Sequence, residues 1–144
     1  MWREQILEVM ADAELAQPAT SEALAEVERV LGQPLPEDLA LLLHECNGVR
    51  GHYGTDAVWS AERIAKENAS FRASADFAKL YMPFEPLMFF GDNGGGDQFA
   101  FVRVPLRADV FVWDHATDER VWAANGLDDY LRRALEDSGD WWRG

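Results

Sequence analysis

The chain has 144 residues, of which 48% are hydrophobic, and its formal net charge at pH 7 is −13. This length suits one well-packed domain, so we expect a single domain over residues 1–144. The excess of acids argues against binding to nucleic acids and to anionic membranes, because both need clustered Lys and Arg. The acidic charge can instead serve solubility or attract a basic protein partner.

The first third of the chain predicts three helices. Apolar residues recur at helical spacing over 2–15, which indicates an amphipathic helix. A second helix is predicted over 21–31, with Gly32 as its C-terminal stop. The third is predicted from Pro36 to Asn47, because a proline stands near its first position and two acids occupy its first turn.

The middle of the chain mixes loop, strand and helix signals. A glycine-rich loop follows Gly48, and a short apolar run at 56–59 indicates a strand. Ser60 is predicted to cap a helix over 61–72. The segment 73–83 has no regular pattern, and we expect it to be irregular.

The last third predicts strands followed by a helix. Apolar and aromatic runs indicate strands at 86–90, 98–103, 109–113 and 120–123, which together suggest an antiparallel meander. Apolar residues at helical spacing over 127–135 predict a closing helix that lies against this sheet.

A glycine-rich acidic turn at 91–98 resembles several ligand loops, but none of them fits. Asp97 stands where a phosphate-binding loop has its lysine, and its carboxylate would repel a nucleotide. A dinucleotide-binding turn would be followed by a helix, whereas a strand is predicted here. A calcium loop beginning at Asp92 would place glycines at two ligand positions. The turn therefore predicts a strand, a loop and a strand.

Four polar residues around this turn are candidates for contact with a partner. Asp97 is expected to accept backbone N–H bonds inside the turn and fix its shape, with direct partner contact as the alternative. Asp92 and Asn93 precede the most flexible glycines, so we expect them to be more exposed. Glu85, just before the preceding strand, completes the set.

The reactive side chains do not form a catalytic or metal-binding pattern. His44 and Cys46 are two residues apart in a predicted helix and point in different directions. His52 and His115 are scattered, without spaced carboxylate partners, so a zinc site is not expected. We therefore expect no catalytic residue, no metal and no cofactor.

The tryptophans divide into two groups. Trp59, Trp113 and Trp122 lie on predicted strands and are expected in the core or at a sheet edge. Trp141 and Trp142 either cover the sheet or form an exposed aromatic contact with a partner.

Cysteine content and the N-terminal residues indicate the compartment. Cys46 is the only cysteine, which excludes an intrachain disulfide and fits a reducing environment. Acids at Glu8, Asp12 and Glu14 leave no apolar signal core or membrane-spanning segment near the N-terminus. We expect a cytoplasmic protein.

The order of these segments resembles the SUKH superfamily, the Smi and Knr type proteins. The helix from Leu35 to Gly48, the strand-turn-strand around Gly91 and the final strand and helix follow one another as in that family. The resemblance covers about residues 21–135, whereas the helix within 1–16 and the tail at 137–144 are less characteristic. The positions that carry the resemblance include Leu35, Pro36, Asn47, Gly48, Trp59, Gly91, Gly95, Gly96, Asp97 and Asp114.

The resemblance implies an α+β domain with a mostly antiparallel sheet of about four to six strands and helices packed around it. It also implies protein binding without catalysis. Many bacterial members are thought to be immunity proteins that neutralise toxins, often nucleases, whereas fungal members act as adaptors in cell-wall and signalling control. We expect an immunity protein that occludes a basic toxin, as a monomer or weak dimer. A housekeeping adaptor is the main alternative, and a small-molecule-binding or enzymatic domain is the weaker one.

Overall fold

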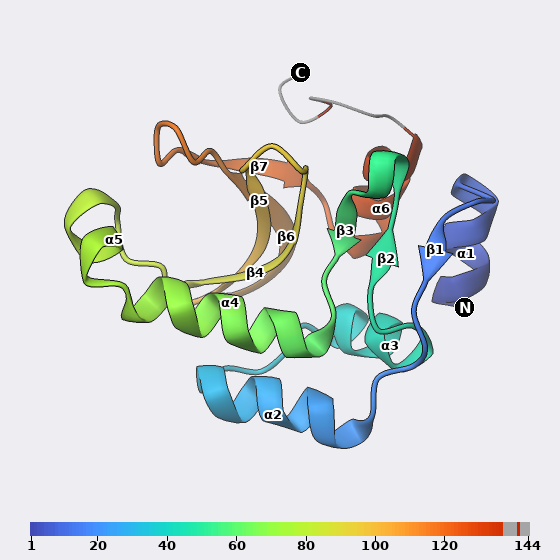
Figure 1. Cartoon of the computed structure of the whole chain (residues 1–144), viewed down its shortest axis with the longest axis horizontal. Coiled ribbons are helices and arrows are strands. Elements are labelled where there is room, and N and C mark those ends of the chain that lie inside the picture. The colour runs from blue at the N-terminus through green and yellow to red at the C-terminus, as the bar shows by residue number, and fades with distance from the viewer. Residues whose placement is uncertain (137–140, 142–144) are drawn as a thin grey trace.

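The computed structural model describes residues 1–136 and residue 141, and it places helices around two antiparallel sheets (Figure 1). The strand orders are β1-β2-β3 and β4-β5-β6-β7. The predicted α+β class is confirmed, and the last four strands form the predicted meander. The elements are α1 (Trp2–Val9), β1 (Glu14–Leu15), α2 (Ser21–Leu31), α3 (Glu37–Glu45), β2 (Val49–Arg50), β3 (Asp56–Val58), α4 (Ala61–Ala73), α5 (Ala75–Leu80), β4 (Leu87–Asp92), β5 (Gln98–Arg103), β6 (Leu106–Trp113), β7 (Arg120–Ala124) and α6 (Leu127–Glu136).

The first helix is shorter than its sequence pattern indicates. We expected a helix to residue 15, but α1 ends at Val9, and Glu14–Leu15 form β1, which pairs antiparallel with β2. A two-residue strand is too short to show an alternating pattern. Pairing with a distant strand therefore overrides the local helical spacing.

The predicted helix over 21–31, its stop at Gly32 and the predicted cap at Ser60 are confirmed. The Thr20 hydroxyl accepts the Ala23 N–H at 3.1 Å and so caps α2, which ends at Gly32 in the left-handed conformation (φ 65°). The Ser60 hydroxyl accepts the Arg63 N–H at 3.1 Å at the start of α4. Both caps satisfy a backbone donor that the helix itself leaves unpaired.

Asn47 lies outside α3, contrary to the prediction that this helix extends to it. The helix ends at Glu45, and the Asn47 Oδ1 accepts the Ala61 N–H at 2.7 Å. Its Nδ2 donates to the Glu62 carboxylate at 2.8 Å. Asn47 therefore joins the end of α3 to the start of α4, a long-range role that the local pattern could not reveal.

The segment 73–83 contains a helix, so the expectation that it is irregular is wrong. The Ser74 hydroxyl accepts the Phe77 N–H at 3.2 Å and begins α5. The rings of Phe77 and Tyr81 lie 5.4 Å apart, and Tyr81 lies at the same distance from Trp113. Aromatic packing against the second sheet thus stabilises a helix too short to have a clear period.

The two sheets meet where β3 lies against β4. The Trp59 N–H donates to the Phe90 carbonyl at 2.7 Å, and the Tyr130 hydroxyl donates to the Ala57 carbonyl at 2.6 Å. Gly91 is buried at this junction, and a Cβ there would lie 2.1 Å from the Ala57 oxygen. Only glycine permits this approach of the two strands.

A buried amide fixes α4 to the same strand. The Asn68 Nδ2 donates to the Ile64 and Phe89 carbonyls at 2.7 and 2.9 Å, and its Oδ1 accepts the Phe89 N–H at 2.8 Å. These bonds satisfy a polar side chain that is almost completely buried. The register of α4 on β4 is thereby fixed.

We predict that Gly91→Ala destabilises the protein by at least about 3 kcal/mol, because the new methyl group would force β3 and β4 apart. Urea denaturation measures the free energy of unfolding. Gly95→Ala is the control, since the nearest atoms to its Cβ would be those of the Asn93 side chain at 3.6–3.9 Å, and it should change stability by less than about 0.5 kcal/mol. Equal effects of the two variants would contradict this account of the junction.

Asp118 organises the turn between β6 and β7. Its carboxylate accepts the Trp113 Nε1–H at 2.8 Å, the Arg120 guanidinium at 3.1 Å and the Met82 N–H at 2.9 Å. Burial raises the pKa of this carboxyl, but the three donors together outweigh burial and hold its pKa below the usual value. The ionised carboxylate is therefore part of the folded state.

We predict that Asp118→Asn lowers the free energy of unfolding by about 1–2 kcal/mol at pH 7, because it loses the charge and one acceptor oxygen. Asparagine tolerates the positive φ of 62° at this position. Because the pKa is lowered in the folded state, the stabilisation is present above the unfolded-state pKa and is lost as the pH falls through the folded-state value. The difference from the wild type should therefore shrink below about pH 4 in urea titrations, and a constant difference would contradict the prediction.

Candidate protein-binding site

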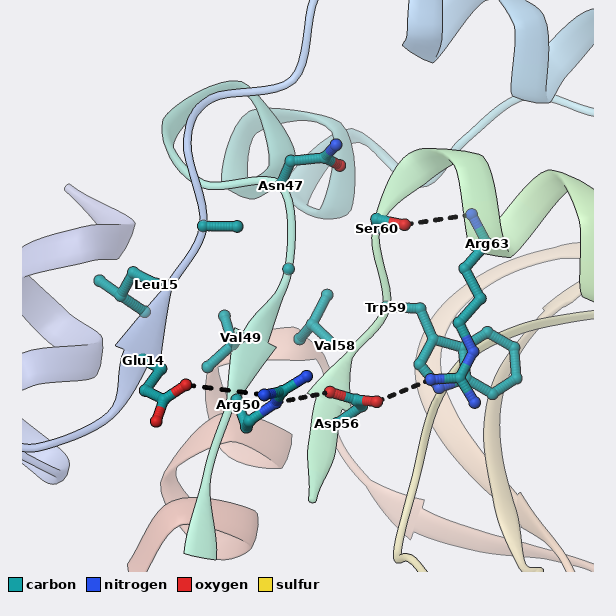
Figure 2. Close-up of a pocket in the computed structure, with 12 residues that line it drawn as sticks. Glu14, Leu15, Asn47, Val49, Arg50, Asp56, Val58, Trp59, Ser60 and Arg63 are labelled. Carbon is teal, nitrogen blue, oxygen red and sulfur yellow. Dashed lines mark hydrogen bonds and ion pairs between the residues drawn. The ribbon is translucent and has the colours of Figure 1, made fainter. Parts of the chain in front are cut away.

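A pocket of about 350 Å³ opens between the first sheet and the start of α4 (Figure 2). Its apolar walls include Val49, Val58 and Trp59, which are buried. Charged side chains of both signs also line it, namely Glu14, Arg50, Asp56 and Arg63. The pocket therefore combines an apolar surface with a charged rim.

The charged side chains of the rim form a chain of ion pairs. The Arg50 guanidinium lies 3.7 Å from the Glu14 carboxylate, and its Nε donates to the Asp56 Oδ1 at 3.3 Å. The other Asp56 oxygen accepts the Arg63 Nη1 at 2.8 Å. Exposed pairs of this kind add little stability each. Their effect here is to hold the charged side chains in fixed directions around the pocket.

Asp92 connects the pocket to the glycine-rich loop. One of its oxygens accepts the Trp59 Nε1–H at 2.8 Å and the Arg63 Nη2 at 3.2 Å, and the other accepts the Gly94 N–H at 2.8 Å. The Arg63 guanidinium also lies 4.4 Å from the centre of the Trp59 ring. Asp92 was expected to be exposed, but its side chain is only 16% exposed and engages these groups. Burial, and then the Asp92 charge, raise the pKa of Tyr130 well above its usual range.

The loop after Asp92 lies beside the β2–β3 hairpin. The Asn93 Oδ1 accepts the Gly95 N–H at 2.9 Å, and the Asn93 N–H donates to the Asp97 carbonyl at 3.2 Å. A Cβ on Gly94 would lie 3.3 Å from the Thr55 hydroxyl. The loop tip therefore borders the hairpin that forms one side of the pocket.

Asp97 lies beneath His115 at the other end of the loop. Its Oδ1 accepts the His115 backbone N–H at 3.2 Å and lies 2.7 Å from the ring Nδ1. Gly96 has φ 107°, and a Cβ there would lie 2.8–3.0 Å from the His115 ring. The expectation that the histidines lack a carboxylate partner is therefore wrong for His115. With its side chain 3% exposed, Asp97 links two turns from within.

One group among the described residues could hold a metal ion. It comprises Asp97, Asp114 and His115, whose ligand atoms lie within 4.8 Å of one another. Asp114 Oδ1 also accepts the Ala116 N–H at 2.9 Å, and His115 bonds Asp97. An ion would therefore have to replace hydrogen bonds that already shape these turns.

Comparison with known proteins places this fold in a family. A model of the SMI1/KNR4 family (SUKH-1) matches residues 18–133. The chain belongs to this family. The match confirms the resemblance seen in the sequence and supports a non-catalytic domain that binds other proteins. No individual curated protein matches the sequence.

The remaining motif positions of this SUKH-1 chain shape the fold around the pocket. Leu35 is buried and its N–H donates to the Glu28 carboxylate at 2.7 Å, while Pro36 is the N-cap residue that precedes α3. Gly48 lines the pocket with φ 121°, and a Cβ there would lie 3.3 Å from the Val58 carbonyl. A side chain at this position would crowd the strand beside it.

Glu85 does not share a surface with Asp92, and Trp141 packs on the second sheet. Glu85 precedes β4 and Asp92 ends it, so at about 3.3 Å per residue they lie roughly 20 Å apart. The Trp141 ring stacks on Phe99 at 5.4 Å and an interplanar angle of 8°. Trp142 lies outside the described residues.

The His44 and Cys46 side chains do not lie together. His44 is exposed on α3, whereas Cys46 is buried just beyond its end, where burial raises the pKa of the thiol.

None of the helices in residues 1–136 combines the length and apolar content that crossing a bilayer requires.

Sequence reasoning missed Tyr53, the most exposed large hydrophobic side chain among the described residues. It lies at the tip of the β2–β3 hairpin, is 95% exposed and has φ 57°. A left-handed conformation is uncommon for an aromatic residue. The flanking glycines signalled a loop, but nothing in the sequence indicated that the ring projects from it.

We predict that Asp92→Asn lowers the free energy of unfolding by about 1–2 kcal/mol, because Arg63 loses one of its two charged partners and keeps only Asp56, while the amide oxygen can still accept from Trp59 or Gly94. Thermal and urea denaturation measure the change. The control is Asp128→Asn, which removes an exposed pair with Arg132 on α6, keeps an amide oxygen that can accept from Gln5, and should cost less than about 0.5 kcal/mol. Comparable losses in both variants would show that Asp92 has no special connecting role.

Proposed function

We propose that this SUKH-1 chain is an immunity protein that binds a basic protein toxin and blocks its active surface. The observation that carries the proposal is the uneven distribution of charge. Residues 1–45 contain ten acids and two arginines, so this segment holds −8 of the net −13. Electrostatic complementarity of this strength speeds association with a positively charged partner.

The acids of this segment lie almost entirely at the surface. Apart from Glu45, whose carboxylate accepts the backbone N–H groups of Trp2 and Arg3 at the start of α1, its acids are exposed. They follow α1, β1, α2 and α3, which lie to the right of and below the second sheet in Figure 1. The exposed acids are Glu4, Glu8, Asp12, Glu14, Glu22, Glu26, Glu28, Glu37 and Asp38.

The pocket region joins this acidic surface to uncharged contact groups. Glu14 belongs to both the acidic segment and the pocket rim. The Asn93 loop and the Tyr53 hairpin border the same region, and Tyr53 supplies a rigid aromatic group of the kind that often dominates binding energy. The proposed contact surface therefore consists of Glu14, Asp12, Asn93 and Tyr53. Asp92 and Asp97 stabilise its shape from below.

We predict that Asp12→Lys with Glu14→Lys slows association with the basic toxin encoded beside this gene by about tenfold or more at low ionic strength. Stopped-flow or surface-binding kinetics measure the rate. Association of the wild type should also slow as salt is added, because screening weakens the attraction.

The matched control for this prediction is Asp76→Lys with Glu119→Lys, which changes the net charge equally at exposed positions on α5 and the β6–β7 turn. Its association rate should stay close to that of the wild type. If both double variants slowed association equally, the effect would come from net charge and not from the position of these acids. An association rate that does not change with salt would contradict electrostatic attraction as the cause.

We predict that Tyr53→Ala weakens toxin binding by about 2 kcal/mol, or roughly thirtyfold, through faster dissociation. The exposed ring contributes little to folding, so the free energy of unfolding should change by less than about 0.5 kcal/mol. Calorimetry and urea denaturation give the two quantities. Unchanged affinity would remove the hairpin tip from the contact surface.

The alternative, a housekeeping adaptor of the Smi/Knr type, could use the same acidic surface. Co-expression with the neighbouring gene distinguishes the two. An immunity protein rescues growth and co-purifies with the toxin, and the Asp12→Lys/Glu14→Lys pair should weaken both effects. Co-purification with a regulatory or cell-wall protein, without rescue, would favour the adaptor.

A further inference from the structure

In the part of the chain that the structure describes, the outer edge of β7 pairs with no other strand. This five-residue strand, Arg120–Ala124, pairs with β6 on one side, and no strand within residues 1–136 pairs with its other side. Exposed edges offer free N–H and C=O groups, and proteins usually protect them with proline, lysine or a bulge that turns the edge away. β7 contains neither proline nor lysine, and the one irregularity in its pairing with β6 falls at Ala123, outside the stretch Arg120–Trp122.

The register identifies which backbone groups face outward. The Asp114 N–H donates to the Glu119 carbonyl at 2.9 Å, and Val112 and Trp113 pair with Val121 and Arg120. Bonded and non-bonded pairs alternate along an antiparallel ladder. The backbone groups of Val121 therefore face β6, whereas those of Arg120 and Trp122 face away from the sheet.

Two neighbouring side chains at this edge are apolar and accessible. Val121 is 47% exposed and Trp122 is 44% exposed. Arg120 lies beside them, and its charge is offset by Asp118 at 3.1 Å and by the Pro83 carbonyl at 2.7 Å. An edge with free backbone groups, an exposed indole and a neutralised arginine suits pairing with another strand.

We propose that β7 pairs antiparallel with β7 of a second copy of this chain, with Val121 on the two-fold axis. In this register Arg120 of each copy lies directly opposite Trp122 of the other, and each of these two pairs can exchange two hydrogen bonds. Directly opposite residues share a face of the sheet, so the Trp122 indole of each copy lies beside the Arg120 side chain of the other, whose guanidinium stays bonded to Asp118 and Pro83 of its own copy. The edge is therefore complementary to itself, as a two-fold interface requires.

The charge distribution also permits this pairing. Residues 98–124 carry three arginines and four acids, a net charge of −1, whereas residues 1–45 carry −8. Repulsion between two copies therefore comes mainly from distant charges, which salt screens. The short strand gives a small interface, so the dimer is weak and depends on concentration.

Sedimentation velocity of the full chain over increasing concentration, at low and high NaCl, tests the proposal. We expect a reversible dimer whose population rises with salt, whereas toxin association under the proposed function slows with salt. The dimer proposal and the toxin proposal can therefore be contradicted separately. A chain that stays monomeric at every concentration and salt level would overturn the dimer and leave the toxin proposal unaffected.

Charge exchange at the axis tests the register. Val121→Lys and Val121→Glu should each abolish the dimer, because each places two like charges opposite one another, and a 1:1 mixture of the two variants should restore it. Trp122→Pro should abolish it as well, since proline removes an outward N–H that edge strands do not use internally. Leu106→Lys, at a 61% exposed position on β6, is the control and should dimerise like the wild type.

The variants can contradict the β7 interface or its register. Dimers that survive Val121→Lys would overturn β7 as the interface, and single variants that dissociate without rescue in the mixture would overturn the two-fold register. Circular dichroism checks that each variant is folded. A monomeric wild type whose β7 amide signals shift only on adding toxin would assign the edge to a foreign strand and contradict self-pairing.

Discussion

The contact between β3 and β4 is the constraint on which the rest of the molecule depends. At Gly91 the two backbones come so close that a side chain would strike the Ala57 carbonyl. The same carbonyl accepts the Tyr130 hydroxyl, which brings α6 to the junction. Two small sheets thereby share one core, and neither the three-stranded sheet nor the meander could bury its apolar face as well alone.

The candidate site is the solvent-facing side of that junction. Trp59 follows β3 and Asp92 ends β4, so the bond between them exists only because the strands meet there. Arg63 joins both residues to Asp56 and so continues the network to the rim. Polar groups that look like separate surface charges in the sequence are thus one connected structure, and most of the exposed acids among the described residues lie in residues 1–45.

Local signals in the sequence predicted most of the fold. The Ser60 cap, the Gly32 stop and the meander depend on neighbouring residues, and their pattern is visible in the chain. The strands β1 and β2 were missed because two residues cannot show a period, and their pairing depends on distant partners. The site was less predictable, because the bonds from Asp92 to Trp59 and from Asp97 to His115 span 33 and 18 residues.

The loop between Asp92 and Asp97 has a consequence for how such a protein can evolve. Both ends are fixed, one by Trp59 and Arg63 and the other by His115, and Gly96 leaves no room for a side chain beneath the ring. Insertions and deletions would separate these anchors, whereas substitutions at Asn93 or Gly95 would leave them in place. Related proteins can therefore differ in the side chains of the loop tip, and with them in the range of partners, while the two anchored ends of the loop stay the same.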